Sequence, residues 1–164
     1  MIDAVELLKK IISEHNPEDI WASSPFIRYR ALGNTTKGEI GEEFISRYLG
    51  YSDFSIGRAS RISEIDLVIE GQSTEVKTAS LGANGTFQFN HIRLDRAYDL
   101  LFCLGICPDQ IVFNVWDKEE VNNGEASRLV MMAQGQDVTY KLIKKLDGMR
   151  PVGEMTNVLR SKMD

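Results

Sequence analysis

The sequence predicts an α/β fold in which helices flank a mixed central β-sheet. Apolar residues recur at helical spacing in the first 50 residues, and short apolar or alternating runs typical of strands fill the middle of the chain. The length of 164 residues is that of one ordinary domain, and 43% hydrophobic residues are enough for a substantial core. Because no repeat, low-complexity stretch or linker divides the sequence, we expect a single domain over residues 1–164.

Helical spacing predicts helices at several places along the chain. Apolar residues at positions 4, 5, 7, 8, 11 and 12 indicate a helix over 3–15, with Asp3 as its N-cap. Residues 21–37 are expected to be irregular, and a second helix is expected over about 37–49, ending at Gly50. Further helices are expected over about 87–98, 138–146 and 151–162.

Strands are expected between these helices. Residues 64–69 and 74–78 are interpreted as two strands joined by a turn at Gly71-Gln72. Two more are expected at about 100–106 and 111–116, separated by a turn at Pro108-Asp109. Cys103 and Cys107 fall in the apolar run LLFCLGIC. Since two thiols make only half a zinc site and no histidine lies nearby, we expect buried, unligated thiols.

The net charge of −5 is unusual for a DNA-binding protein, but the charge is unevenly distributed. Residues 62–120 hold 4 basic and 10 acidic side chains, whereas 21–61 and 121–164 each carry a small basic excess. This pattern fits a metal site between phosphate-binding edges. No apolar run approaches the roughly 20 residues of a membrane span, and no signal-peptide cleavage site is visible. We therefore expect a cytoplasmic protein that does not enter a membrane.

The strongest motif is the segment EIDLVIEGQSTEVK, residues 64–77. Side chains alternate between the two faces of a strand, so Glu75 and Lys77 share a face. A type II′ turn at Gly71-Gln72 would place Asp66 opposite Lys77, on the face that also carries Glu75. A one-residue slip of this register would separate Asp66 from the other two residues.

This group of side chains suits metal-dependent hydrolysis of a phosphodiester. Mg²⁺ prefers hard oxygen ligands, which Asp66, Glu75 and the carbonyl of Val76 are able to supply. A bound metal lowers the pKa of a water molecule and polarises the phosphate. Lys77 is suited to orient or deprotonate the attacking water. A salt-bridge cluster on a solvated hairpin is the alternative interpretation of the same residues.

The hairpin resembles the D-x(n)-E-x-K core of the PD-(D/E)XK nuclease superfamily, which includes type II restriction endonucleases and archaeal-type Holliday junction resolvases. Glu64-Ile65 precedes the Asp where the superfamily name has Pro, at a position that varies among members. The resemblance covers about residues 37–116. It implies a restriction-endonuclease-like fold, to which the helices at 3–15, 138–146 and 151–162 are accessory.

The segment KGEIGEEF, residues 37–44, adds to the resemblance. In many superfamily members a helix before the catalytic hairpin carries a Glu that faces the metal site, and the match gives this role to Glu42. Helical geometry agrees, because Glu42 lies on the flank of the apolar stripe while Glu39 and Glu43 point toward solvent. An acidic first turn that complements the helix dipole is the alternative, and it explains Glu39 well.

Other residues are candidates for the site or for binding nucleic acid. Superfamily members often have a Gln or Lys after the E-x-K strand, and Gln88 is the candidate here, with a plain loop residue as the alternative. Arg93 and Arg96 are three residues apart, so they are able to share a helix face and hold phosphates. Further candidates for phosphate contacts lie beside the 37–49 helix and the hairpin: Arg28, Arg30, Lys37, Arg58 and Arg61.

The resemblance implies a Mg²⁺-dependent endonuclease for double-stranded DNA, with Mn²⁺ able to substitute and no small-molecule cofactor. A restriction or mobile-element nuclease is favoured over a repair or Holliday-junction nuclease. Resolvases bind through extensive basic surfaces, and a net charge of −5 fits such a surface poorly. A non-catalytic DNA-binding or assembly module with the same fold is the alternative from another class. Since cutting both strands usually needs two active sites, we expect a homodimer, with the N-terminal helix as candidate interface, or else a nickase.

One basic segment is expected to play no part in the site. Lys141, Lys144 and Lys145 are interpreted as the solvated face of the 138–146 helix, with DNA contact as the alternative.

Overall fold

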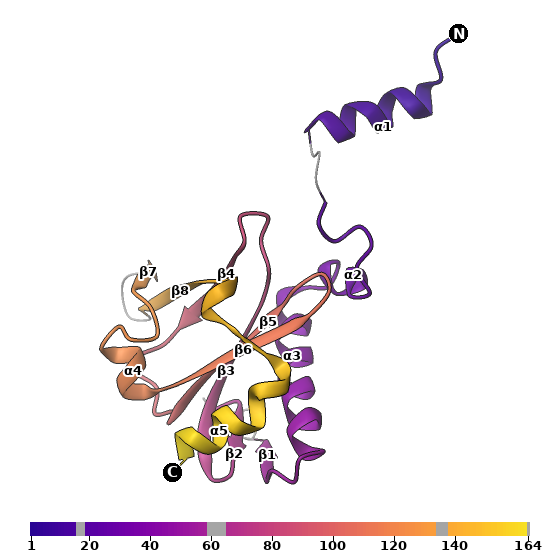
Figure 1. Ribbon diagram of the computed structural model, residues 1–164. Coiled ribbons are helices and arrows are strands. Elements are labelled where there is room, and N and C mark those ends of the chain that lie inside the picture. Colours follow the sequence, from indigo (N-terminus) through magenta and orange to yellow (C-terminus); the bar gives the residue numbers. More distant parts are fainter. Residues whose placement is uncertain (16–18, 59–64, 134–137, 164) are drawn as a thin grey trace.

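The computed structural model describes residues 1–15, 19–58, 65–133 and 138–163 (Figure 1). The helices are α1 (Ala4–His15), α2 (Ile27–Arg30), α3 (Asn34–Gly50), α4 (Lys118–Asn122) and α5 (Met155–Met163), with 3₁₀ turns η1 (Leu146–Gly148) and η2 (Val152–Glu154). The strands are β1 (Ile56–Arg58), β2 (Leu67–Ile69), β3 (Gln72–Ser80), β4 (Thr86–Ile92), β5 (Leu100–Ile106), β6 (Ile111–Asp117), β7 (Leu129–Ala133), β8 (Thr139–Lys145) and β9 (Arg150–Pro151).

These strands form two sheets. The larger sheet has the order β1-β2-β3-β5-β6-β9. It is mixed, because β3 and β5 run parallel while every other pair of adjacent strands in this sheet is antiparallel. The smaller sheet, β4-β8-β7, is antiparallel. The predicted α/β class with a mixed central sheet is confirmed, and β5 and β6 lie where the apolar runs predicted them.

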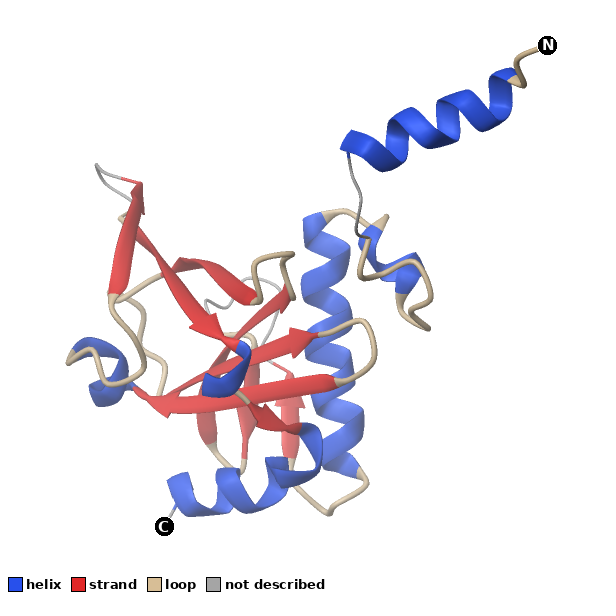
Figure 2. Cartoon of the chain, turned by 45° about the horizontal axis from the view of Figure 1, so that its top comes forward, coloured by secondary structure: helices blue, strands red, loops and turns tan. Residues whose placement is uncertain are grey.

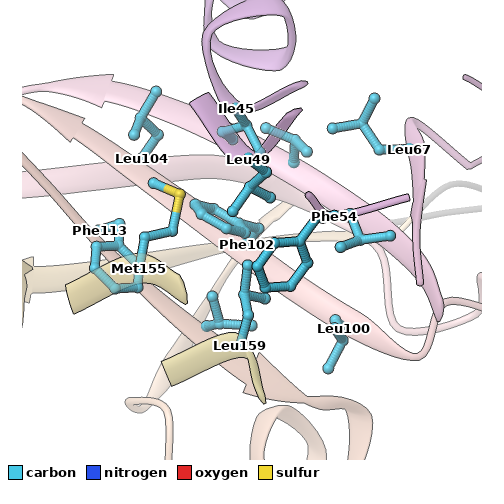
Figure 3. Close-up of a cluster of buried hydrophobic side chains, with 13 residues drawn as sticks. Ile45, Leu49, Phe54, Leu67, Leu100, Phe102, Leu104, Phe113, Met155 and Leu159 are labelled. Atoms are coloured by element: carbon cyan, nitrogen blue, oxygen red, sulfur yellow. The ribbon is translucent and has the colours of Figure 1, made fainter. Parts of the chain in front are cut away.

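Helices cover one face of the larger sheet. Ile45 and Leu49 of α3 and Met155 and Leu159 of α5 are fully buried and gather around Phe102 of β5 (Figure 3). The stripe predicted for the second helix therefore does face the core, and the helix predicted over 151–162 is present as α5. Burial of large apolar side chains such as these contributes about 1.5–3 kcal/mol each to the free energy of folding.

The smaller sheet, rather than a helix, covers much of the other face. Phe87 and Phe89 of β4 and Leu142 of β8 are fully buried and pack with Leu101 and Cys103 of β5. Helices thus flank the central sheet on one side, and a second layer of strands lies on the other side (Figure 2).

Both cysteines are free and buried, as predicted. Burial raises the pKa of the Cys103 thiol above its ordinary value and raises the pKa of Cys107 to about 11. Such thiols are inert as nucleophiles at neutral pH.

The N-terminal helix α1 projects away from the rest of the chain in both ribbon views (Figures 1 and 2). Its predicted N-cap is confirmed, because the Asp3 carboxylate accepts the N–H groups of Val5 at 2.9 Å and of Glu6 at 3.3 Å. No residue of α1 is buried, and apolar residues such as Leu8 and Ile12 are more than half exposed. Across the described ranges, no helix combines the length and the apolar character needed to cross a membrane.

Two of the predicted helices are wrong. The segment 87–98 forms strand β4 followed by a loop, and the segment 138–146 forms strand β8. In β4 the residues alternate strictly from buried Phe87 to exposed Gln88, buried Phe89 and exposed Asn90. Leu142 of β8 pairs with residues of both neighbouring strands, so tertiary packing in the smaller sheet determines its conformation. The region 21–37 is also less irregular than predicted, since it holds α2 and the start of α3.

Candidate active site

The hairpin that carries the predicted motif turns at Glu70-Gly71, one residue earlier than predicted. β2 pairs with β3 from Leu67↔Thr74 to Ile69↔Gln72. Both turn residues have positive φ, 48° for the first and 79° for the second, as a type I′ turn requires. The predicted type II′ turn at Gly71-Gln72 is therefore wrong.

Two hydrogen bonds to Ser55, the residue before β1, hold Glu70 in its left-handed conformation. This conformation costs a non-glycine residue about 1–2 kcal/mol. The N–H of Glu70 donates to the carbonyl of Ser55, and the Glu70 carboxylate accepts the N–H of Ser55, each at 2.8 Å. These two bonds explain why the turn includes Glu70.

The observed register changes the partner of Asp66 but not its face. Continued by one residue, the register sets Asp66 beside Glu75, whereas the prediction set it opposite Lys77. A shift of two positions keeps every side chain on its face, so all three residues remain together. The residue between Glu75 and Lys77, Val76, points the other way and is buried in the core.

Asp66 is fixed by the backbone of β3. Its Oδ2 atom accepts the N–H of Val76 at 2.8 Å. The pairing of β2 with β3 stops at Thr74, so at Val76 the Asp66 side chain takes the place of a strand neighbour. Because the N–H and C=O of one residue point to the same side of a strand, the Val76 carbonyl points toward this edge too.

Glu75 is the most buried charged residue of the site. Its side chain is 4% exposed, with Oε1 3.3 Å from Nζ of Lys77 and Oε2 3.9 Å from Nη1 of Arg96. Among the described residues, Oε2 has no hydrogen-bond partner. Burial, followed by the negative charge of Asp66, raises the pKa of the Glu75 carboxyl, while Lys77 and Arg96 oppose this rise. A cation bound at Oε2 would relieve the cost of burying this carboxylate.

Arg96 comes to the site from the loop after β4, not from a helix as predicted. Lys118, the first residue of α4, donates a hydrogen bond from Nζ to the backbone carbonyl of Arg96. The same Nζ lies 3.6 Å from the ring centroid of buried Tyr98. Burial lowers the pKa of Lys118, and burial followed by the charge of Glu75 raises the pKa of Tyr98.

Sequence reasoning missed Lys118 and Tyr98. Neither belongs to a motif, and both lie within the field of the Glu75 charge because the 93–99 loop folds against the start of α4. Nothing in their local sequence marks this contact.

Helix α3 approaches β3 at Gly41. A Cβ atom on this glycine would lie 1.9 Å from Oγ1 of Thr78, so only glycine allows the observed contact. The next residue, Glu42, is half-buried, while Glu39 and Glu43 are exposed as predicted. The role of Glu42 at the metal stays a prediction.

Gln88 and Lys37 meet at a polar cleft of about 310 Å³ between α3, β3 and β4. Gln88 is exposed on a strand, so its alternative interpretation as a plain loop residue is wrong. Ser80 of β3 and Asn90 of β4 also line this cleft. The cleft adjoins β3, the strand that carries Glu75 and Lys77.

Besides Arg96, which lies beside Glu75, two of the predicted phosphate contacts are engaged with acidic residues. Arg30 lies 2.7 Å from Asp19, and Arg93 lies 2.6 Å from Asp95. Of the others, Lys37 lines the polar cleft, Arg28 is exposed on α2, Arg58 lies on β1, and Arg61 lies outside the described residues.

The oxygen atoms at this edge of β3 are of the kind that hard cations prefer. In the part of the chain that the structure describes, no three His, Cys, Asp or Glu side chains are grouped to hold a metal. Asp66 and Glu75 offer two carboxylates, and Val76 offers a carbonyl at the same edge. Mg²⁺ usually takes one or two carboxylates and completes its shell with water and substrate phosphate.

Comparison with protein-family models and with curated proteins gave no match. Among solved structures, the chain is similar to that of a bacterial homing endonuclease, I-Ssp6803I. The match has a TM-score of 0.46 and 16% sequence identity, and it covers 80% of this chain and 99% of the other.

Proposed function

We propose that this protein is a metal-dependent DNA endonuclease in which Asp66 and Glu75 hold Mg²⁺, with the Val76 carbonyl as a further ligand. The observation that carries the proposal is the buried Oε2 atom of Glu75, which has no hydrogen-bond partner among the described residues and lies beside a second carboxylate. A solvated salt-bridge cluster does not account for a glutamate that is 4% exposed. The motif resemblance to PD-(D/E)XK nucleases supports the same function.

The residues around Glu75 divide the work of hydrolysis. When bound, Mg²⁺ supplies positive charge to the phosphate and lowers the pKa of water. Lys77, with its side chain 20% exposed, holds the attacking water in line with phosphorus and offsets negative charge. Arg96, with its side chain 31% exposed, offers N–H donors to a phosphate oxygen. Water gives up a proton as its oxygen bonds to phosphorus, the P–O bond to the leaving oxygen breaks, and the leaving oxygen takes up a proton.

The proposed substrate is double-stranded DNA, and the proposed assembly is a homodimer of restriction or mobile-element type. Each chain carries one Asp66–Glu75 pair, so cutting both strands requires two copies. The unburied apolar residues of α1 supply a contact between copies, because exposed apolar surface of this kind marks an interaction site.

Cleavage of supercoiled plasmid and phage DNA in Mg²⁺ and in Mn²⁺ tests the proposal. We expect the wild type to cut and the variants Asp66→Asn, Glu75→Gln and Lys77→Met to lose at least about 100-fold in rate. Glu43→Gln, which removes an exposed acid of α3, is the matched control and should cut normally. Cutting of four-way junctions alone would identify a structure-specific nuclease instead. Binding without cutting by the wild type on every substrate would contradict the proposal and favour a binding module.

Metal binding is measured separately by thermal unfolding with added Mg²⁺ or Mn²⁺. A ligand at 100 times its dissociation constant stabilises the folded state by about 2.7 kcal/mol. The wild type should be stabilised in this way, and Asp66→Asn and Glu75→Gln should respond far less. Equal stabilisation of all three proteins would contradict the ligand assignment.

A further inference from the structure

One face of the smaller sheet points away from the core and carries amide and basic side chains. The register pairs Gln88 of β4 with Ile143 of β8, and Lys141 of β8 with Val130 of β7. Paired residues share a face. We call this the outer sheet face, and its members are Thr86, Gln88, Asn90, Val130, Lys141, Ile143 and Lys145.

The outer sheet face is positive in a protein whose net charge is negative. The strands β4, β7 and β8 contain no Asp or Glu, although the whole chain contains 24 acidic residues. Lys145 is exposed, and neither it nor Lys141 forms an ion pair within the described ranges. Arg128, which immediately precedes β7, is exposed as well. Lys144 points inward instead, since its Nζ donates to the Ala126 carbonyl at 2.7 Å.

The outer sheet face borders the polar cleft beside β3. Gln88 and Asn90 line the polar cleft together with Thr78 and Ser80 of β3, the strand that carries Glu75 and Lys77. The chain passes directly from β3 of the larger sheet to β4 of the smaller sheet through residues 81–85. A polymer bound along the outer sheet face would therefore meet β3 at the edge of the cleft.

We propose that the outer sheet face docks in the major groove of double-stranded DNA, with Gln88 and Asn90 at base edges and Lys141 and Lys145 on phosphates. This inference rests on the proposed function, and it adds the surface that positions DNA and reads its sequence. The major groove of B-DNA admits a β-ribbon, and Gln or Asn amides pair with N6 and N7 of adenine. Lysines on the same face supply the phosphate contacts that dominate affinity.

The spacing of the two amides matches the spacing of bases. Residues i and i+2 of a strand lie about 6.6 Å apart, at about 3.3 Å per residue. Two base steps along one DNA strand span about 6.8 Å, at about 3.4 Å per step. Gln88 and Asn90 therefore meet bases two steps apart. An RNA duplex, whose major groove is deep and narrow, should compete poorly for this face.

The charge part of the proposal is tested by DNA binding in EDTA, where no metal-dependent cutting occurs. Fluorescence anisotropy with a 30-bp mixed-sequence duplex compares the wild type, Lys141→Gln/Lys145→Gln and Arg47→Gln/Arg150→Gln. The control pair removes the same charge from exposed positions on α3 and β9. We expect only the first pair to weaken binding, with the slope of log K against log salt reduced by about 0.9 per lost phosphate contact. Equal effects of the two pairs would overturn the proposal.

The base-reading part is tested by selecting duplexes from a random library with the wild type, Gln88→Ala, Asn90→Ala and the control Asn157→Ala, which changes an exposed residue of α5. The wild type should select adenines two steps apart, and each β4 variant should lose preference at one of them. An unchanged motif in both variants would overturn this assignment.

These measurements separate the inference from the proposed function. If the wild type cuts DNA and both sets of sheet variants bind as tightly and as selectively as the wild type, the inference alone fails. If nothing is cut but the sheet variants lose binding, the nuclease proposal fails and the outer sheet face stands. A wild type that binds no duplex overturns the inference.

Discussion

The carboxylate of Asp66 receives the backbone N–H of Val76, which is the residue between Glu75 and Lys77. The acid is thus tied to the strand that carries its two partners, at the point where β2 and β3 separate. Groups held by strand pairing are positioned more rigidly than groups on loops. Arg96 lies on a loop, and Lys118 anchors it through a hydrogen bond to its backbone carbonyl.

Glu75 is expected to lower the stability of the fold at neutral pH. Its pKa in the folded protein lies above its ordinary value, chiefly through burial. Its favourable contribution is therefore fully present below the ordinary pKa and is lost as the pH rises through the raised pKa. Glu75→Gln should increase the free energy of unfolding at pH 8, and this gain should shrink toward pH 4.

Thermal unfolding at the two pH values measures this effect, with exposed Glu43→Gln as the control. A pH-independent change in Glu75→Gln would contradict the assigned shift. The expected combination is an inactive enzyme that is more stable than the wild type, which is typical of charged groups retained for function.

Gly41 should tolerate no side chain. Gly41→Ala places a Cβ 1.9 Å from Oγ1 of Thr78 and should destabilise the protein by about 1–3 kcal/mol, as overpacking does. Chemical denaturation of Gly41→Ala, Thr78→Ala and the double variant forms a cycle that isolates the contact. The double variant should recover part of the loss, because the hydroxyl is gone. Additive effects would show that α3 does not press on β3 at this point.

Lys118 should matter for catalysis through Arg96. Lys118→Met keeps the methylene chain over Tyr98 but loses the bond to the Arg96 carbonyl, and we expect about a 10-fold lower cleavage rate, or about 1.4 kcal/mol. The double variant Lys118→Met/Arg96→Gln should lose less activity than the product of the two single losses, because both substitutions act through the Arg96 side chain. Lys162→Met, which removes another partly buried lysine, is the control. If the cleavage rate of the double variant fell by the full product of the two single losses, Lys118 would not act through Arg96.

The apolar side of α1 should hold two copies together. Leu8→Glu/Ile12→Glu replaces two apolar side chains of α1 that are exposed in the single chain by charged ones. The thermal stability of the protein outside α1 should therefore be unchanged. Sedimentation should show a dimer for the wild type and for Ser13→Glu, an exposed control, but a monomer for the double variant. A wild type that sediments as a monomer would contradict the proposed assembly.

Some parts of the fold could be predicted from sequence because the local signal was strong. The fully buried run of β5 and the apolar run of β6 have no other interpretation at their lengths. The shared face of Asp66, Glu75 and Lys77 was predicted correctly even though the turn was wrong. The wrong turn changed the strand partner of Asp66 by two residues, from Lys77 to Glu75, and a shift of two residues keeps the face. A one-position error would have separated Asp66 from the pair.

The rest could not be predicted, for two different reasons. In β4 the alternation of Phe87, Gln88, Phe89 and Asn90 was a usable strand signal, and the helical interpretation overlooked it. In β8 no such alternation exists, since its burial pattern depends on neighbouring strands and on Lys144 turning inward. The approach of Arg96 to Glu75 likewise arises from tertiary structure alone.

The chain passes back and forth between the two sheets. It leaves the larger sheet after β3 to form β4, returns for β5 and β6, leaves again for β7 and β8, and returns once more for β9. Neither sheet is therefore made from one continuous stretch of sequence, and the two sheets share a core of side chains from β4, β5 and β8. We expect the two sheets to unfold in one cooperative transition, in which the outer sheet face and the carboxylate pair are lost at the same temperature.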